Sequence, residues 1–307
     1  IDMKSKSRLI PIFSVVILTY NAEKTIKDCI VKISTALNKF RYEIIVIDSE
    51  SGDQTVPIIE TLKHTISVRI INVLKKKFSF SNTRNLSIKI ATGKYVCFVS
   101  GDAILAEKQS FKYFIDDFEL SSKVVAVFGN QISNKNTSEF QKMEFVCRFG
   151  ELDYQANKEG VFLQHKYVRE LLPDSKYYLF NTFSCFKRSF LIKHPFPQVE
   201  AYEDFALGKY IIDNGYSKVY DRRCSVYHSH TLNSFSYIKK QIEDIRWGRQ
   251  YRARTSNKII CKILRIISSD KSLPQKIVLF IIMSYYYLLK CVALFIIFAY
   301  KLVRKSI

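Results

Sequence analysis

Short apolar runs alternate with amphipathic segments through the first third of the chain. The runs have the length of buried strands and fall at 13–19, 42–47, 68–73 and 94–99. Between them, apolar residues recur at helical spacing from about residue 23 to residue 38, after Thr55, and at 81–91. Strands that alternate with helices predict an α/β fold of the Rossmann-like kind, with a mostly parallel sheet flanked by helices.

Three of the predicted strands are followed at once by polar loops, at 19–21, 48–53 and 100–102. Because the carboxyl ends of parallel strands meet at one edge of a sheet, these loops are expected to converge on a ligand. The sequence contains neither GxGxxG nor GxxxxGK[ST], which argues against a dehydrogenase and against a P-loop enzyme. A nucleotide at this edge would have to be held by side chains and a metal ion.

Asp102 stands beside Gly101, directly after the apolar run 95–99. A carboxylate in this place can hold a divalent cation on a diphosphate, since such cations prefer oxygen ligands and the glycine permits close approach. The alternative is that Asp102 only caps the turn into the next helix, which is a common role for aspartate. The residue alone does not decide between the two.

The chain is strongly basic, since 48 Lys and Arg against 28 Asp and Glu give a formal net charge of +20 at pH 7. This excess favours a polyanionic partner, which could be nucleic acid, an anionic membrane surface or a phosphate-rich substrate. No recognition module for nucleic acid is evident in the sequence, so nucleic acid is not expected. The seven cysteines include no CxxC pair, and residues 1–9 are too polar for a signal peptide. A reducing cytosol is therefore the expected environment.

Three segments resemble the nucleotide half of a family 2 glycosyltransferase with the GT-A fold: FSVVILTYNAEKTIKDCI, IIVIDSESGDQT and NTRNLSIKIATGKYVCFVSGDA. The branch they look most like contains bacterial rhamnosyltransferases and related enzymes of surface polysaccharide assembly. The resemblance implies that seven residues bind the donor: Thr19, Tyr20, Asn21, Asp48, Arg84, Gly101 and Asp102. It also matches Asp102 to the last carboxylate of the metal-binding DxD motif, with Ser100 in place of the first. The implied cofactor is a divalent cation, Mn²⁺ or Mg²⁺.

Glu203 and Asp204 begin a predicted helix that stops at Asn214 and Gly215. Carboxylates in a first turn are favoured by the helix dipole, so both could serve as dipole partners only. In the resemblance they match the ED motif that supplies the catalytic base, and that role falls on Asp204. Inverting transfer needs one carboxylate to take the proton of the acceptor hydroxyl as it attacks C1 of the sugar.

His228 and His230 stand two residues apart at the end of another predicted strand, where alternate side chains point the same way. A histidine in a strand is often structural. In related GT-A enzymes, however, a histidine after this strand can complete the metal shell or reach the diphosphate. His228 is therefore the second metal-site candidate, with Asp102. Residues 129–174 carry no motif and are expected to shape the acceptor site.

The predicted organisation is a catalytic domain over 1–232, with a nucleotide half at about 10–105 and an acceptor half at about 106–232, followed by helices over 233–307. Residues 235–262 form a basic amphipathic pattern that suits an anionic leaflet or, alternatively, a solvated helix packed on the catalytic domain. Residues 277–300 are nearly all apolar, and as a helix they would be about 36 Å long, enough for a bilayer. Association with the cytoplasmic face of the cell membrane is expected, peripheral or anchored through 277–300.

The sequence thus predicts an inverting, metal-dependent transferase that moves a sugar from a nucleotide-sugar donor to a hydroxyl of a glycan or lipid-linked acceptor. A sugar nucleotidyltransferase is the alternative enzyme, but it needs a glycine-rich loop with an arginine after the first strand, which residues 18–21 do not supply. A non-catalytic membrane-binding protein is the alternative from another class. Such a protein would have no use for Asp102 together with Glu203 and Asp204.

Overall fold

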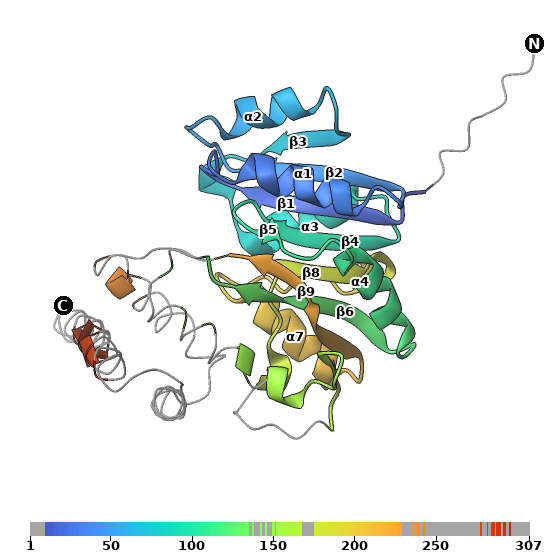
Figure 1. Ribbon diagram of the computed structural model, residues 1–307, viewed down its shortest axis with the longest axis vertical. Coiled ribbons are helices and arrows are strands. Elements are labelled where there is room, and N and C mark those ends of the chain that lie inside the picture. The colour runs from blue at the N-terminus through green and yellow to red at the C-terminus, as the bar shows by residue number, and fades with distance from the viewer. Residues whose placement is uncertain are drawn as a thin grey trace, which may run out of the picture.

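Within the described part of the computed structural model, the strands form one nine-stranded mixed sheet with helices on both faces (Figure 1). The structure describes residues 10–134, 149, 150, 152–167 and 175–228, and single residues elsewhere: 137, 142, 145, 235, 237–239, 242, 277, 281, 284, 285, 287–289, 291, 292 and 295. The strands are β1 Phe13–Thr19, β2 Tyr42–Asp48, β3 Val68–Asn72, β4 Tyr95–Ser100, β5 Ile104–Leu105, β6 Val124–Ile132, β7 Val161–Gln164, β8 Phe183–Lys187 and β9 Ser217–Tyr227.

The predicted nucleotide half is parallel, as expected, with the strand order β3-β2-β1-β4. Its helices are α1 Ile26–Ala36, α2 Thr55–Leu62 and α3 Phe80–Ile90, with a short 3₁₀ turn, η1, at Lys75–Lys77. Helix α1 begins later than the predicted residue 23. Glu23 is instead bound to the loop after β2, because its N–H donates to Asp53 and its carboxylate accepts from the N–H of Gln54, each at 3.1 Å.

The second half continues the same sheet with mixed strand directions. Strand β8 lies between β4 and β6 and is antiparallel to both, and β6 then pairs with β9 in parallel. The short strands β5 and β7 are both antiparallel to β9. Residues 161–164, which carried no motif, therefore form part of the sheet. The two predicted halves share one continuous sheet of hydrogen bonds.

Successive side chains of a strand point to opposite faces of the sheet, and in β1 the side chains on both faces are largely apolar. Helices therefore cover both faces. Val15 and Ile17 of β1 belong to one buried cluster with residues of α1, α2 and α4 Ser110–Glu119. Val16 belongs to a second cluster with residues of α3, α6 Arg188–Lys193 and α7 Glu203–Asp213. A second 3₁₀ turn, η2 Ser175–Tyr177, contacts α7. The second face thus carries α7, the helix predicted to hold the catalytic base.

The C-terminal quarter is described only at single residues. Most of the predicted basic helix at 235–262 and most of the predicted apolar helix at 277–300 lie outside the described residues. The described residues between 277 and 295 are helical. Among all described residues, no helix has the length and apolar character that a membrane crossing requires.

Candidate active site

A cavity of about 1210 Å³ opens where the parallel strands end. The loops after β1, β2 and β4 all contribute to its walls, which is the convergence that the sequence predicted. Nine of the ten predicted site residues line this one cavity: Thr19, Tyr20, Asn21, Arg84, Gly101, Asp102, Glu203, Asp204 and His228. The cavity therefore unites residues from both halves of the chain.

Asp48 is the tenth residue, and it is not in the lining. Its side chain is buried, and both of its carboxylate oxygens accept hydrogen bonds from Ser51, one from the N–H at 2.8 Å and one from the hydroxyl. In this structure Asp48 shapes the loop after β2. Its role in donor binding stays a prediction.

Asn21 joins the first loop to the second. It adopts a left-handed backbone conformation, with φ at 49°, which asparagine tolerates better than most residues. Its amide oxygen accepts from the N–H of Gly52 at 2.9 Å, and its own N–H donates to Ser51 at 2.8 Å. The neighbouring Tyr20 is half exposed, and the Nζ of Lys75 lies 4.4 Å above its ring and 2.6 Å from its hydroxyl.

Gly101 permits close contact between the ends of β1 and β4. A Cβ at this position would lie 2.7 Å from Oγ1 of Thr19, so any larger residue would separate the two loops. The element after Asp102 is the short strand β5, and helix α4 begins only at Ser110. Asp102 therefore does not cap a helix.

His228 lies beside Asp102, with 3.5 Å between its Nε2 and a carboxylate oxygen. The other ring nitrogen, Nδ1, is 3.0 Å from the amide oxygen of Gln131, which fixes the plane of the ring. Ligands in adjacent positions around one divalent cation lie about 3 Å apart, and carboxylate oxygen and imidazole nitrogen both suit Mn²⁺. The pair Asp102 and His228 therefore fits a divalent cation. His230 lies outside the described residues.

A buried ion pair in the cavity wall links the two halves. The guanidinium of Arg84 on α3 donates to the carboxylate of Glu203 in the first turn of α7. The rings of Phe80, Phe98 and Phe196 surround the guanidinium, at 5.1, 5.7 and 5.8 Å from their centroids. Glu203 is thus neither exposed nor a dipole partner only, because it neutralises a buried cation.

Asp204, the next residue, is partly buried in the cavity wall. Burial and the adjacent charge of Glu203 raise its pKa to about 7, while Arg84 and the backbone N–H groups of Phe205 and Asn181 oppose that rise. A carboxyl group with a pKa near neutrality, open to a cavity, is well suited to accept a proton at physiological pH.

Two contributors were missed by sequence reasoning. Gln131 orients His228. Asn181 lies in the cavity wall, and its backbone N–H donates to the carboxylate of Asp204. The only sequence signal for Asn181 is a polar residue within an aromatic stretch at 177–186. Gln131 had no signal, since a polar residue near the end of a strand, here β6, is common and marks no particular role.

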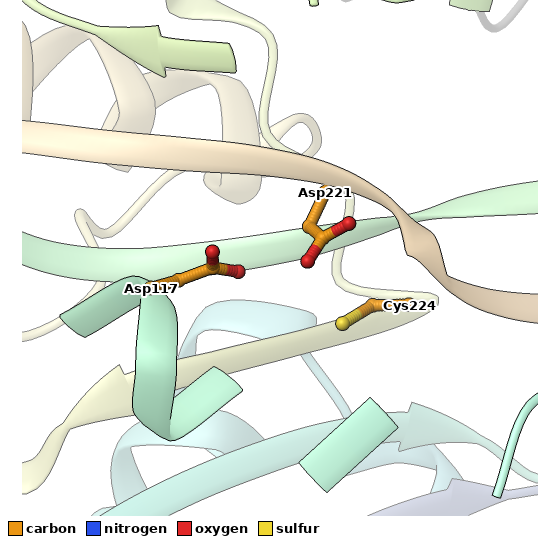
Figure 2. A group of neighbouring side chains, drawn as sticks. All are labelled: Asp117, Asp221 and Cys224. Carbon is orange, nitrogen blue, oxygen red and sulfur yellow. The ribbon is translucent and has the colours of Figure 1, made fainter. Parts of the chain in front are cut away.

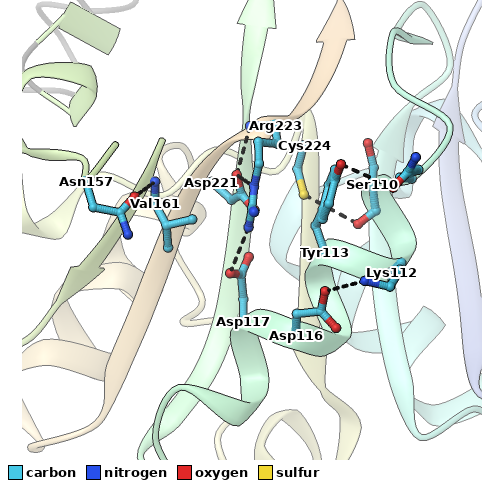
Figure 3. A network of polar contacts seen from close by, with 11 residues as sticks. Ser110, Lys112, Tyr113, Asp116, Asp117, Asn157, Val161, Asp221, Arg223 and Cys224 are labelled. Carbon is cyan, nitrogen blue, oxygen red and sulfur yellow. Dashed lines mark hydrogen bonds and ion pairs between the residues drawn. The ribbon is translucent and has the colours of Figure 1, made fainter. Parts of the chain in front are cut away.

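A second polar cluster lies away from the cavity, between α4 and β9. Ligand atoms of Asp117, Asp221 and Cys224 lie within 4.8 Å of one another, and all three side chains are buried (Figure 2). The guanidinium of Arg223 binds both oxygens of Asp221 at 2.8 to 3.1 Å and lies 3.8 Å from Asp117 (Figure 3). The guanidinium of Arg223 thus already supplies the positive charge that a metal ion would bring to these carboxylates.

The protonation of this cluster also disfavours a metal ion. Burial and the charge of Asp221 raise the pKa of Asp117 to about 8. Burial raises the pKa of the Cys224 thiol well above its usual range, and this thiol lies 3.4 Å from the carbonyl of Ser110. Because metals bind thiolates and carboxylates rather than their protonated forms, we interpret the cluster as a structural network.

The fold is that of a GT-A glycosyltransferase, as comparison with known proteins shows. The family model "Glycosyl transferase family 2" matches residues 14–194, more than half of the chain. The chain therefore belongs to glycosyl transferase family 2.

Two bacterial relatives show how far the similarity extends. The O-antigen chain rhamnosyltransferase RfbN of Salmonella typhimurium is 29% identical over 191 residues, which cover 61% of this chain and 57% of that protein. The poly(ribitol-phosphate) beta-N-acetylglucosaminyltransferase TarS of Staphylococcus aureus is 30% identical over 109 residues, 34% of this chain and 19% of that protein. The chain thus matches little more than half the length of the first relative and a fifth of the second.

Solved structures share the fold at lower sequence identity. The mannosyltransferase PcManGT of Pyrobaculum calidifontis, in complex with GDP-Man and Mn²⁺, has a TM-score of 0.54 at 18% identity, covering 94% of this chain and 73% of that one. TarS residues 1–349 in complex with UDP also give a TM-score of 0.54 at 18% identity, over 86% and 68% of the two chains.

The Asp117 network predicts a pH-dependent stability. The raised pKa means that the folded protein keeps a proton that the unfolded chain releases above about pH 4. The stabilisation from this proton is full below that pH and is lost as the pH rises through about 8. Between pH 5 and 9, the free energy of unfolding should fall by about 1–3 kcal/mol more in the wild type than in Asp117→Asn.

Urea unfolding at several pH values measures this difference. Asp116→Asn is the matched control, because Asp116 is on the same helix in a solvent-exposed pair with Lys112. Equal pH dependence in the wild type and Asp117→Asn would show that Asp117 does not hold the proton.

Proposed function

We propose that the protein transfers a sugar, with inversion at C1, from a nucleotide-sugar donor to a hydroxyl group of a glycan or lipid-linked acceptor. The observation that carries the proposal is the shared cavity, which brings Asp204 together with Asp102 and His228. A single displacement needs one base for the attacking hydroxyl and charge stabilisation for the leaving diphosphate. The cavity supplies groups for both.

The donor is proposed from the loops and from the relatives together. The end of β1 offers the buried hydroxyl of Thr19 and the half-exposed Tyr20, and the loop after β4 offers Gly101. All three lie at the edge where open α/β sheets bind nucleotides. The structures with a similar fold hold UDP or GDP-Man. A nucleoside diphosphate on these loops would place its phosphates toward Asp102.

Asp204 is proposed as the general base. Its pKa of about 7 leaves much of it ionised at neutral pH and makes it a stronger base than an ordinary aspartate. Glu203 would act through Arg84, because their ion pair fixes the first turn of α7 and so the position of Asp204.

A divalent cation, Mn²⁺ or Mg²⁺, is proposed on Asp102 and His228. When bound, it would neutralise charge on the diphosphate leaving group. Ser100 replaces the first carboxylate of the usual motif, so this chain offers one carboxylate and one imidazole, with Gln131 holding the imidazole. The remaining ligands would come from the diphosphate and water.

We also propose that the protein acts at the cytoplasmic face of a membrane. The described residues of the C-terminal helix include a row of exposed apolar side chains three or four positions apart: Ile277, Ile281, Tyr285, Leu288, Val292 and Phe295. Such spacing places them on one helix face. The sequence adds Lys276, Lys301, Arg304 and Lys305 at the two ends, which suits anionic lipid headgroups. The acceptor would then be a glycan or lipid-linked molecule at that membrane face.

Replacing the proposed base tests the mechanism. Asp204→Asn should lower the rate of sugar transfer by roughly 10²–10⁴-fold, because the acceptor hydroxyl loses its proton acceptor. Donor affinity should change little. In the wild type, the rate should rise with pH and level off above about 7, as Asp204 loses its proton. Asp213→Asn, in an exposed pair with Lys209 at the other end of α7, is the control. Near-normal transfer by Asp204→Asn would contradict the assignment.

Replacing the proposed metal ligand tests the second role. Isothermal titration of UDP and GDP, with Mn²⁺ and with EDTA, separates metal-dependent affinity from direct contacts. In Asp102→Ala the gain in affinity on adding Mn²⁺ should fall by about 10-fold or more, since a ligand of the ion is lost, while affinity in EDTA should be unchanged. An unchanged gain would remove Asp102 from the metal site.

Removing the residues from 273 onward tests the membrane proposal. On vesicles that contain anionic lipid, the intact chain should stay bound in 1 M NaCl, because the apolar contact is not screened. The truncated chain should be released by the same salt. Donor hydrolysis should persist, because the sheet and both core clusters lie almost entirely before residue 229. Release of the intact chain by salt alone, or unfolding of the truncated one, would instead indicate that 277–300 belongs to a buried core.

A further inference from the structure

Asn181 carries a buried amide of which only half has a partner. The residue precedes β8 in the cavity wall and is 3% exposed. Its amide oxygen accepts from the hydroxyl of Ser184 at 2.8 Å, and its backbone N–H donates to the carboxylate of Asp204. Its amide nitrogen, Nδ2, has no hydrogen-bond partner among the described residues.

An unpaired buried donor is unusual and costly. Most buried polar atoms in folded proteins have a partner, and leaving one without costs about 1–3 kcal/mol. With its oxygen bonded to the hydroxyl of Ser184, the amide has its nitrogen side left to form a bond to another group. Since Asn181 lines the cavity, a ligand in the cavity is the partner that this donor can gain.

The position of Asn181 indicates which part of a ligand it would meet. The carbonyl of Thr182, the next residue, accepts from the N–H of Ser100 at 3.2 Å, so Asn181 stands close to the loop that carries Asp102. The backbone N–H of Asn181 also donates to the carboxylate of Asp204, so Asn181 is close to that residue as well. In the proposed reaction, the leaving diphosphate is near Asp102 and the attacking hydroxyl is at Asp204. The sugar ring that is transferred must lie between those two, and therefore over Asn181.

We propose that Nδ2 of Asn181 donates a hydrogen bond to a hydroxyl group of the transferred sugar, and that Asn181 thereby selects the donor sugar. This inference rests on the proposed function. It differs from nucleotide binding, because the bond goes to the sugar and is lost when the sugar leaves. A site built to hydrogen-bond a hydroxyl discriminates against sugars that lack it in the right position, because the buried donor then stays unpaired.

Two substitutions separate the hydrogen bond from the packing. Asn181→Ala removes the amide but keeps the backbone N–H on Asp204. Asn181→Leu keeps the size and adds no charge but has no N–H to donate. Ser110→Ala is the control, since it removes a buried hydroxyl that bonds to the carbonyl of Glu107 outside the cavity lining and leaves the donor of Asn181 in place.

The measurement is the dissociation constant of each variant for UDP and GDP, and for UDP-glucose, UDP-N-acetylglucosamine, GDP-mannose and a nucleotide-activated rhamnose. For the sugar nucleotide that the wild type binds best, both Asn181 variants should bind about 5–10-fold more weakly, while the free nucleoside diphosphate should bind within about 2-fold of the wild type. Discrimination among the sugars should fall by a similar factor.

The outcomes distinguish this inference from the proposed function. If the wild type binds none of the sugar nucleotides, the proposed function itself fails. If the wild type binds one and both Asn181 variants bind it equally well, the inference is overturned. Equal weakening toward the sugar nucleotide and the free nucleoside diphosphate would assign Asn181 a structural role, and a change confined to the KM of the acceptor would place it on the acceptor side. Either result overturns the inference.

Discussion

The buried ion pair between Arg84 and Glu203 is the contact on which the geometry of the candidate site depends. It joins α3 in the nucleotide half to the first turn of α7 in the second half, across 119 positions of sequence. Both side chains are only 7% exposed, so loss of either partner would leave an uncompensated buried charge, at a cost of about 3–5 kcal/mol. Asp204 follows Glu203 directly. The charge that positions the helix therefore also sets the field in which Asp204 titrates.

The sheet explains why the cavity lies where it does. Along the chain, the strands run outward from β1 through β2 to β3 and then return to the other side of β1 at β4. The carboxyl ends of β1 and β4 thus flank the point where the direction of winding reverses, which is where open α/β sheets bind ligands. Gly101 lets the two loops meet there, because only a residue without a side chain fits against Thr19. Strand β8 then extends the sheet from β4 and brings Asn181 to the same edge.

The parts of this structure that depend on nearby residues could be predicted from the sequence. The four parallel strands, their helices and the polar loop ends follow from local periodicity and from one rule about parallel sheets. Contacts between distant segments could not be predicted in this way. The antiparallel insertion of β8, the pairing of β6 with β9 and the bond from Gln131 to His228 leave no local pattern. For Asp48 the local pattern was present but did not predict the contact. The family motif marks this residue for donor binding, whereas its carboxylate in this structure accepts hydrogen bonds from Ser51.

Two carboxylate pairs in this protein show that access to the cavity, and not the pKa alone, separates a candidate base from a structural acid. In each pair, one arginine binds one carboxylate and leaves its neighbour with a raised pKa: Arg84 binds Glu203 beside Asp204, and Arg223 binds Asp221 beside Asp117. The electrostatic arrangement is therefore the same. Asp204 lies in the wall of the cavity, whereas Asp117 is sealed between α4 and β9 and outside its lining. A proton on Asp117 can be exchanged only when that packing opens, so its titration affects stability. A proton on Asp204 can pass to and from a molecule in the cavity, and its titration can therefore affect turnover.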